Sequence, residues 1–284
     1  MHAVGLGRRS PDIGSESWIT VPDYGLEAMR EATRGMTFDG VVHLAAAGVY
    51  PSDREVASLI NGNALLPVAV VQLAAQVQAR SVVVAGSSAE YAASEMPMLD
   101  EHATLESGTL YGGSKAAGGL LALSVAATLG MPCAVLRLFN VFGPGEAPHR
   151  LLPSLHGSLR EGQPVALSTG TQVRDFVHVD DVCQAVTQAL TGLAGGILAT
   201  GAYNVATGVG HSVREFAQSV AQTMEKPASL LRFGALPMRP DDRLTVIGDA
   251  SAFCAATGWA PAFSFLEAVA SSVDELNRDS RDKV

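Results

Sequence analysis

The sequence predicts an α/β fold built on a doubly wound parallel sheet, with a smaller, interleaved C-terminal lobe. Short runs of β-branched residues alternate with longer helical stretches, the pattern of parallel strands covered by helices on both faces. The chain has 284 residues and is 48% hydrophobic, enough to bury a large core. Beyond Gly143-Pro144 the alternation loosens. We therefore expect residues 1–143 to form the sheet domain and residues 144–284 to form mainly a second lobe, interleaved with the first.

The expected elements follow from hydrophobic periodicity and from the Gly, Pro, Asn and Ser residues between the runs. In the first part, strands are predicted at residues 2–7, 18–21, 39–46, 81–85 and 133–139, and helices at 26–33, 64–79 and 111–129. In the second part, helices are predicted at 151–161, 180–191 and 212–224, and strands at 164–167 and 176–179.

Charge and cysteine usage narrow the class of protein. A net charge of −9 without any Lys/Arg-rich run argues against a nucleic-acid surface. The three cysteines, Cys133, Cys183 and Cys254, are far apart, so neither a disulfide framework nor a zinc site is expected. No apolar run reaches the roughly 18 to 20 residues of a membrane span, and the N-terminus lacks the apolar core of a signal peptide. We expect a soluble, cytoplasmic protein.

The helices expected at 64–79 and 111–129 are apolar nearly all round. A helix covered by a sheet on one side only shows a polar stripe on the other, so the outer faces of these two are expected to be buried as well. A homodimer formed through a helix bundle explains this, and burial inside a monomer is the alternative. Each glycine inside the second helix costs up to about 1 kcal/mol relative to Ala, which close helix contact would justify.

Tyr111 and Lys115 carry the strongest chemical signal. The i, i+4 spacing places both side chains on one helical face, about 5 to 6 Å apart at Cβ. An adjacent ammonium favours phenolate and lowers a tyrosine pKa from about 10, so Tyr111 can exchange a proton near neutral pH. Ser87 and Ser88 follow a Val-rich strand upstream and offer a hydroxyl to a substrate oxygen. Such a set is typical of enzymes that transfer hydride to or from a carbinol or ketone.

Several motifs together resemble the extended short-chain dehydrogenase/reductase family, which includes NAD(P)-dependent nucleotide-sugar epimerases, dehydratases and 4-ketoreductases. The matching segments, in family order, are Asp39-Gly-Val-Val-His-Leu-Ala-Ala46, Asn63, Gly86-Ser-Ser-Ala-Glu-Tyr91, Tyr111 to Lys115, Leu136-Arg-Leu-Phe-Asn-Val-Phe-Gly-Pro144, Arg174-Asp-Phe-Val-His-Val-Asp-Asp181 and Arg239-Pro-Asp241. The resemblance implies a Rossmann-like sheet, an NADP or NAD cofactor and a nucleotide-diphosphate sugar as substrate.

The resemblance also implies roles for individual residues. Tyr111 is the acid/base, and Lys115 holds the nicotinamide ribose and lowers the tyrosine pKa. Ser88 bonds the reacting oxygen of the sugar, with Ser87 as the alternative. The residues implied on the cofactor side are Leu44, Ala45, Ala46 and Asn63, together with Tyr111 and Lys115. For the turn at 44–46, ordinary packing at a strand end is the alternative.

Asn140, Arg174 and Arg239 occupy positions where this family contacts the nucleotide diphosphate. A planar guanidinium suits paired phosphate oxygens. Arg150 is a weaker candidate for the same role. We expect His178 to pack beside its strand. His149 and His156 lie seven residues apart without a carboxylate or cysteine to complete a set, so no metal site is expected.

Ser88-Ala89-Glu90 resembles the Thr-Asp-Glu of nucleotide-sugar 4,6-dehydratases. The family's Asp position is Ala89 here, so one carboxylate remains, and Glu90 is kept as a candidate catalytic residue. Elimination of water is therefore doubtful. The segment Gly86-Ser-Ser-Ala-Glu-Tyr91 resembles 4-keto-6-deoxyhexose reductases more closely than it resembles the dehydratases.

The family's glycine-rich loop between the first strand and the first helix is absent from the sequence. In the favoured register, residues 2–7 are the second strand of the fold, and the first βα unit is lacking, which leaves a gap at the centre of the sheet. Arg8 and Arg9 then follow Gly7, where an acid would bond the ribose 2′-hydroxyl, and two cations there favour NADP over NAD. The alternative is that both arginines simply lie in solvent at the end of a strand. A competing register uses Gly7, Ser10 and Gly14 as a degenerate loop.

The sequence thus predicts an oxidoreductase acting at C4 of a nucleotide sugar, either a 4-keto-6-deoxyhexose reductase or a 4-epimerase. A 4,6-dehydratase and a non-catalytic nucleotide-sugar-binding remnant are the alternatives.

Overall fold

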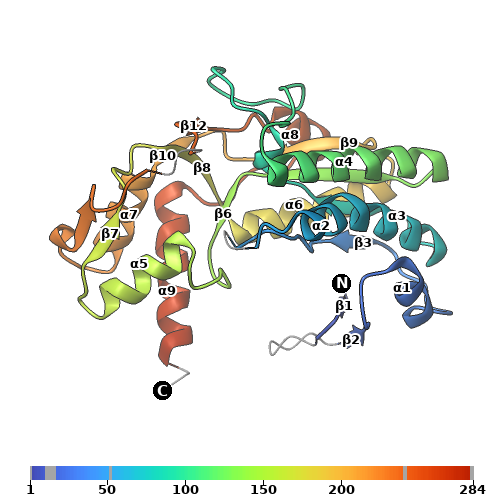
Figure 1. Ribbon diagram of the computed structural model, residues 1–284, viewed down its shortest axis with the longest axis horizontal. Helices are drawn as coiled ribbons and strands as arrows, with labels where there is room; N and C mark the ends of the chain where they lie inside the picture. The colour runs from blue at the N-terminus through green and yellow to red at the C-terminus, as the bar shows by residue number, and fades with distance from the viewer. Residues whose placement is uncertain (1, 10–16, 51–52, 239–241, 282–284) are drawn as a thin grey trace. The chain divides into compact units, whose positions relative to one another are not determined.

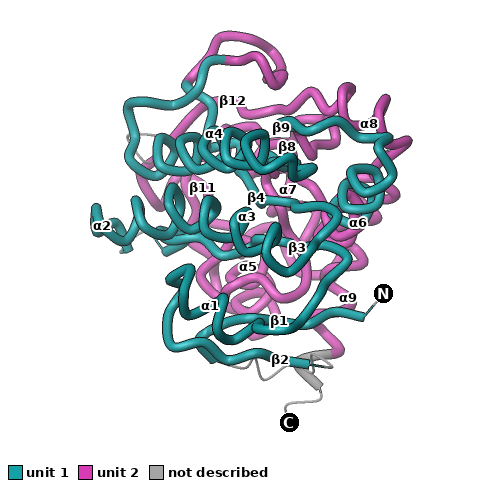
Figure 2. The backbone as a smooth tube through the Cα atoms, turned by 90° about the vertical axis from the view of Figure 1, so that its right-hand side faces the viewer, with its two compact units in different colours: residues 1–92, 104–137, 186–203 teal, residues 93–103, 138–185, 204–284 magenta. Residues whose placement is uncertain are grey.

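The computed structural model describes residues 2–9, 17–50, 53–238 and 242–281. The chain divides into two compact units, each built from stretches that alternate along the sequence (Figure 2). Unit 1 comprises residues 1–92, 104–137 and 186–203, and unit 2 comprises residues 93–103, 138–185 and 204–284.

Unit 1 contains a sheet with the strand order β3-β4-β5-β9, of which β3 and β9 are labelled in Figure 1. Its strands are β3 (Val41–His43), β4 (Val82–Ala85), β5 (Cys133–Leu138) and β9 (Gly201–Val205). β4 pairs in parallel with β3 on one side and β5 on the other. Because both faces of β4 are covered, its valines are fully buried, as expected for a central parallel strand.

A second, two-stranded sheet in unit 1 pairs β1 (Val4–Gly7) with β2 (Ser17–Thr20) in parallel. Among the described residues, this pair is separate from the β3-β4-β5-β9 sheet. The lack of a glycine loop stays a prediction. Ser10 and Gly14, which the competing register requires, lie outside the described residues.

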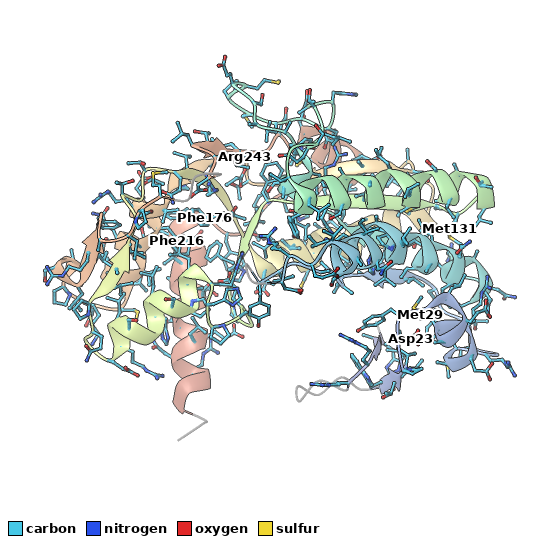
Figure 3. All side chains as sticks on the ribbon, viewed as in Figure 1. Asp23, Met29, Met131, Phe176, Phe216 and Arg243 are labelled. Atoms are coloured by element: carbon cyan, nitrogen blue, oxygen red, sulfur yellow. The ribbon has the colours of Figure 1, made fainter. Side chains whose placement is uncertain are left out.

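The helices of unit 1 lie mostly where the sequence predicted them. They are α1 (Leu26–Ala32), α2 (Val56–Leu59), the π-helical η1 (Ile60–Leu65), α3 (Leu66–Gln76), the 3₁₀ turn η2 (Ser88–Glu90), α4 (Leu110–Leu129) and α6 (Val179–Ala194), the first part of which belongs to unit 2. α3 and α4 lie side by side, and their inner faces pack on β4 and β5. The same core includes Met29 of α1 and Met131, both labelled in Figure 3.

The helix expected at 64–79 begins at residue 56, because α2, η1 and α3 run on without a break. Its 21 residues, Val56–Gln76, are long and apolar enough to cross a membrane, whereas the sequence analysis expected no such segment. Length and composition are weak evidence of a span, since core helices share both. Buried residues such as Val71 and Ala74 place α3 in the core of unit 1.

At two glycines of α4, the backbone of a neighbouring segment lies very close to the helix. A Cβ on Gly118 would lie 1.9 Å from the carbonyl oxygen of Asn63 in η1, and one on Gly112 would lie 2.3 Å from the carbonyl oxygen of Ala89. Close contact therefore accounts for these two glycines, whereas a Cβ on Gly113 would meet its nearest neighbour at an ordinary 3.5 Å, so the expectation does not hold for every glycine of this helix.

Unit 2 holds two small sheets and a helical layer. Its strands are β6 (Asn140–Phe142), β7 (Val165–Leu167), β8 (Val173–His178), β10 (Gly210–Ser212), β11 (Leu231–Phe233) and β12 (Thr245–Val246). β8 is the central strand, paired with β6, β10 and β12, while β7 pairs with β11. The helices wholly in this unit are α5 (Leu151–Arg160), α7 (Val213–Thr223), the short η3 (Ala228–Leu230), α8 (Ser251–Thr257) and α9 (Phe265–Arg281). Phe176 and Phe216 stack at 4.4 Å in its core (Figure 3).

Candidate active site

The predicted catalytic residues come together in unit 1, where β3 and β4 end and α4 begins. Ser87 and Ser88 follow the carboxyl end of β4, and Tyr111 and Lys115 lie in the first two turns of α4. The carboxyl edge of a parallel sheet is where open α/β folds bind ligands.

Lys115 links α4 directly to the end of β4. Its Nζ donates a hydrogen bond of 2.6 Å to the carbonyl oxygen of Ala85, and the residue is 7% exposed. Burial lowers the pKa of Lys115, and the negative charge of Glu90 opposes that effect. An ammonium has three N–H groups, so the bond to Ala85 leaves two others for a ligand.

Tyr111 is half-buried between a glycine and a cation. A Cβ on Gly48, which has φ of +76°, would lie 3.2 Å from the Tyr111 ring, so only glycine gives the ring its present space. The guanidinium carbon of Arg54 lies 5.2 Å from the ring centroid, a cation–π distance. The sequence analysis did not single out Arg54, and no motif marks it.

Asn63 joins the turn after β3 to the catalytic helix. Its Oδ1 accepts a bond from the Ala47 amide at 2.9 Å, and its Nδ2 donates to the Ala47 carbonyl at 3.2 Å and to Ser114 Oγ at 3.1 Å. Ser114 in turn donates to the carbonyl of Tyr111. Asn63 is 2% exposed. Asn63 is therefore a clamp between the turn after β3 and α4, and its implied place on the cofactor side stays a prediction.

Ser87 and Ser88 lie in a tight turn that is held in place by the following residues. Ser87 caps η2: its Oγ accepts from the Ala89 amide at 3.1 Å, and its own amide donates to Glu90 Oε1 at 2.8 Å. The hydroxyl of Ser87 is thus engaged in the capping box. Ser88 is half-buried at the start of η2. This arrangement favours Ser88 as the hydroxyl that meets a substrate.

The side chain of Glu90 points into the protein. It is 1% exposed, and its Oε2 accepts a bond of 3.0 Å from Arg137 Nε on β5. Arg137 also donates to the hydroxyl of the buried Tyr91 at 3.1 Å. Glu90, a candidate catalytic residue of the sequence analysis, is therefore bound within the core, next to the Ser87-Ser88 turn.

The turn after β3 is open and uncharged. Leu44, Ala45 and Ala46 are all exposed, and Leu44 exposes 67% of its surface. His43, at the end of β3, is buried, and burial together with the charge of Lys115 lowers its pKa to about 4. His43 is therefore neutral at neutral pH. A neutral, small-residue turn permits close approach of a ligand backbone.

Arg8 and Arg9 line a cavity of about 550 Å³ together with Trp18 and Tyr24. The guanidinium carbon of Arg8 lies 5.6 Å from the centroid of the Tyr24 ring. Trp18 Nε1 is buried and has no hydrogen-bond partner among the described residues. Two cations and two aromatic rings suit a flat, phosphorylated ligand.

The residues implied in nucleotide-sugar binding belong to unit 2. Arg174 on β8 forms an ion pair with Asp242 and donates to its neighbour's carbonyl, while Asn140 lies on β6, which pairs with β8. Arg150 precedes α5 and pairs with Glu146 at 3.2 Å. Arg239 lies outside the described residues. His178 is buried between aromatic rings, as expected.

The parallel sheet of unit 1 has a serine, a tyrosine and a lysine near its carboxyl edge, an arrangement typical of Rossmann-like proteins, which bind ligands at that edge. Residues 14–206, more than half of the chain, match the model of the NAD dependent epimerase/dehydratase family. The chain belongs to this family, and the resemblance found in the sequence is confirmed.

Individual relatives agree with the family assignment. A dTDP-glucose 4,6-dehydratase of Streptomyces niveus is 26% identical over 245 residues, 86% of this chain and 71% of that protein. A CDP-abequose synthase of Salmonella typhimurium is 30% identical over 136 residues, 47% of this chain and 45% of that protein.

Solved structures extend the likeness to the whole fold. MoeE5 in complex with UDP-glucose and NAD superimposes with a TM-score of 0.84 and 26% identity, over 98% of this chain and 91% of that chain. UDP-glucose 4-epimerase of Thermus thermophilus, in complex with NAD, gives a TM-score of 0.83 and 25% identity, over 96% and 90% of the two chains. The predicted Rossmann-like α/β fold is confirmed.

Proposed function

We propose that this protein is an NAD(P)-dependent oxidoreductase that acts at C4 of a nucleotide-diphosphate sugar, as a 4-keto-6-deoxyhexose reductase or a 4-epimerase. The observation that carries the proposal is the position of Lys115, bonded to the end of β4 one helical turn from Tyr111 and close to the Ser87-Ser88 turn. Relatives that act on nucleotide sugars support the choice of substrate class.

The residues present suit a nicotinamide dinucleotide. The turn at Leu44 to Ala46 is small and exposed, and Lys115 retains N–H groups for ribose hydroxyls. A bound nicotinamide supplies or accepts the hydride. Tyr111 gives a proton to the sugar's 4-oxygen or takes one from it, and Ser88 donates a hydrogen bond to that oxygen.

Elimination of water receives less support. A 4,6-dehydratase needs an acid and a base near C5 and C6, yet Ala89 has no carboxylate and Glu90 is bound to Arg137 in the core. We therefore rank dehydration below chemistry confined to C4.

The deciding experiment incubates the purified protein with NADH or NADPH and a panel of UDP-, dTDP-, GDP- and CDP-hexoses and their 4-keto-6-deoxy forms. Loss of absorbance at the nicotinamide band with a keto sugar supports a reductase. Interconversion of two 4-epimers without net change of cofactor supports an epimerase. Binding of a nucleotide sugar without turnover of any member would leave the non-catalytic alternative and overturn the proposal.

NADP is the cofactor we favour, because Arg8 and Arg9 line the cavity with Trp18 and Tyr24. Replacing both arginines by Ala removes up to two charge-assisted hydrogen bonds to a 2′-phosphate, each worth about 1.5 to 3 kcal/mol. We expect NADPH affinity to fall at least about tenfold and NADH affinity to change little. Titration calorimetry measures both, with the exposed Arg34→Ala as control. Equal losses for the two cofactors would contradict the 2′-phosphate assignment.

Arg174→Ala is expected to weaken nucleotide-sugar binding about 10- to 100-fold, the loss of one bidentate charged contact. Nicotinamide affinity should stay the same, because the predicted cofactor residues belong to unit 1. Arg174→Lys keeps the charge but loses the planar guanidinium, so its nucleotide-sugar affinity should lie between those of the wild type and Arg174→Ala. Calorimetry with the nucleotide sugar measures the series, with the exposed Arg160→Ala as control. Unchanged affinity in Arg174→Ala would remove this residue from the site.

A homodimer through the outer face of α3 and α4 completes the proposal. Leu120, Leu121 and Leu129 of α4 are exposed, as is Leu65 just before α3, and neither Val56–Gln76 nor the exposed part of α4 carries a charge. Exposed apolar residues that gather into a patch mark an interface. Changing Leu120 and Leu121 together to Lys should convert a dimer into a monomer in sedimentation velocity. Ile197→Lys, at another exposed apolar residue of unit 1, should not. A monomeric wild-type protein would contradict this.

A further inference from the structure

A buried ion pair lies beside the catalytic turn. Glu90 and Arg137 are 1% and 5% exposed, and their Oε2 and Nε atoms are 3.0 Å apart. Burying two charges costs several kcal/mol per ion before their attraction is counted, so a packing role alone would be served as well by apolar side chains. A role in the neighbouring candidate site therefore explains the two buried charges better than packing does.

The Glu90 carboxylate is shared between the turn and the ion pair. Oε1 accepts from the Ser87 amide at 2.8 Å, and Oε2 faces Arg137. A Cβ on Gly86 would lie 2.6 Å from Oε1 and one on Gly119 would lie 3.6 Å from Oε2. The carboxylate thus fits into a space that two glycines leave open, one on the turn and one on α4.

Lys115, on α4, contacts the same stretch of backbone as Glu90. It bonds to Ala85, the residue before Gly86, and Gly119 is one helical turn further along α4. Among the described residues, the charged and titratable groups near Lys115 are Glu90 with its partner Arg137, the neutral His43 on β3, and Tyr111 on its own helix. Of these, Glu90 has the negative charge that opposes the loss of solvation of the ammonium. Burial raises the pKa of Glu90, whereas the charges of Arg137 and Lys115 and the bond from the Ser87 amide act against that rise and favour the carboxylate.

We propose that Glu90 is a positioning residue that fixes the Ser87-Ser88 turn and provides the counter-charge beside Lys115, with Arg137 holding the carboxylate in place. The value of that ammonium for hydride transfer rests on the proposed function, whereas its charge state does not. Glu90 then acts through Lys115 and the turn, without touching substrate.

The chain offers a direct test, because it contains only three lysines, Lys115, Lys226 and Lys283. Lysine labelled with ¹³C at Cε reports the charge of each Nζ by NMR, and Lys226→Arg and Lys283→Arg assign the signals. In the wild type, Lys115 should stay protonated through neutral pH. In Glu90→Gln, which keeps the shape but removes the anion, its titration midpoint should fall by about one pH unit or more, while Lys226 stays unchanged.

Glu106→Gln is the matched control. Glu106 also lies next to the start of α4, but its carboxylate accepts from the Gly108 amide at 2.6 Å and is not among the charges that act on Lys115. The Lys115 midpoint should not move in this variant. If Glu90→Gln does not fold because Arg137 is left unpaired, the double variant Glu90→Gln/Arg137→Gln removes both charges, and its Lys115 midpoint should still lie below that of the wild type.

Three results would overturn the inference: an unchanged Lys115 midpoint in the folded Glu90 variants, an equal shift in Glu106→Gln, or a wild-type midpoint below about pH 7. None of these readouts needs turnover. A protein without activity on the nucleotide-sugar panel but with a shifted midpoint in Glu90→Gln would fail the proposed function and keep the role of Glu90.

Discussion

Tyr111→Phe is expected to lower kcat about 10²- to 10⁴-fold, the usual contribution of one general acid or base. The change deletes a single oxygen and keeps the ring against Gly48 and below Arg54, so folding and cofactor binding should be nearly unaffected. Stopped-flow or steady-state rates on the substrate found in the panel measure the loss. Calorimetry should show cofactor affinity within about threefold of the wild type, a difference of less than 1 kcal/mol.

Two further variants make this result specific. Tyr203→Phe removes a hydroxyl from another tyrosine of unit 1, which donates to the Ala199 carbonyl, and should leave kcat unchanged. Lys115→Met should lower both kcat and cofactor affinity, because the ammonium serves both. A Tyr111→Phe enzyme with wild-type kcat would rule out the proposed mechanism.

Gly118→Ala is expected to destabilise the protein by about 3 kcal/mol, at the upper end of overpacking effects. The added methyl would lie 1.9 Å from the Asn63 carbonyl oxygen, and Asn63 is held by its bonds to Ala47 and Ser114. Neither helix can therefore yield without breaking the clamp. Thermal unfolding followed by circular dichroism should show a Tm lower by about 6 to 12 °C.

Gly113→Ala, five residues earlier on the same helix, should have the opposite sign. Its new Cβ would meet its nearest neighbour, the Glu106 carbonyl oxygen, at an ordinary 3.5 Å. Removing a glycine from a helix gains about 0.5 to 1 kcal/mol. Equal effects of the two substitutions would show that the close approach at Gly118 is relieved by backbone movement.

The centre of the fold was predictable because local and tertiary signals agree there. The strand expected at 81–85 is β4 (Val82–Ala85), and the helix expected at 111–129 is α4 (Leu110–Leu129). Long apolar runs ended by Gly and Ser leave few alternatives. The placement of Tyr111 and Lys115 on one helix was predictable for the same reason, since an i, i+4 spacing has a direct meaning on a helix.

The start of the helix at 56 was missed because Asn61, Gly62 and Asn63 read as a turn. Here η1 accommodates them in π-helical geometry, and the amide of Asn63 is satisfied by groups 16 and 51 residues away. Hydrogen bonds to residues so distant in the sequence leave no pattern in the local sequence. The strands β9 to β12 were also not expected, because each has at most five residues and no clear alternation.

Two omissions had a usable signal. Arg137 interrupts the otherwise apolar strand Cys133–Leu138, and an arginine inside a buried strand requires a partner. The partner is the nearby Glu90. A glutamate that is needed to pair with this arginine is a poor candidate for a catalytic residue. The apolar spacing of Phe265, Val269 and Val273 likewise predicts α9, which packs on the core of unit 2.

The separation of β1 and β2 from the four-stranded sheet has a consequence for how unit 1 opens. β4 and β5 are paired on both sides and their amides should exchange with solvent slowly, at the free energy of global unfolding, whereas a two-stranded ribbon opens at lower cost. The arginines beside that ribbon would then meet their ligand in a segment that opens more readily than the four-stranded sheet. Ligand at Arg8 and Arg9 would protect amides of β1 and β2, and leave exchange in β4 almost as it was.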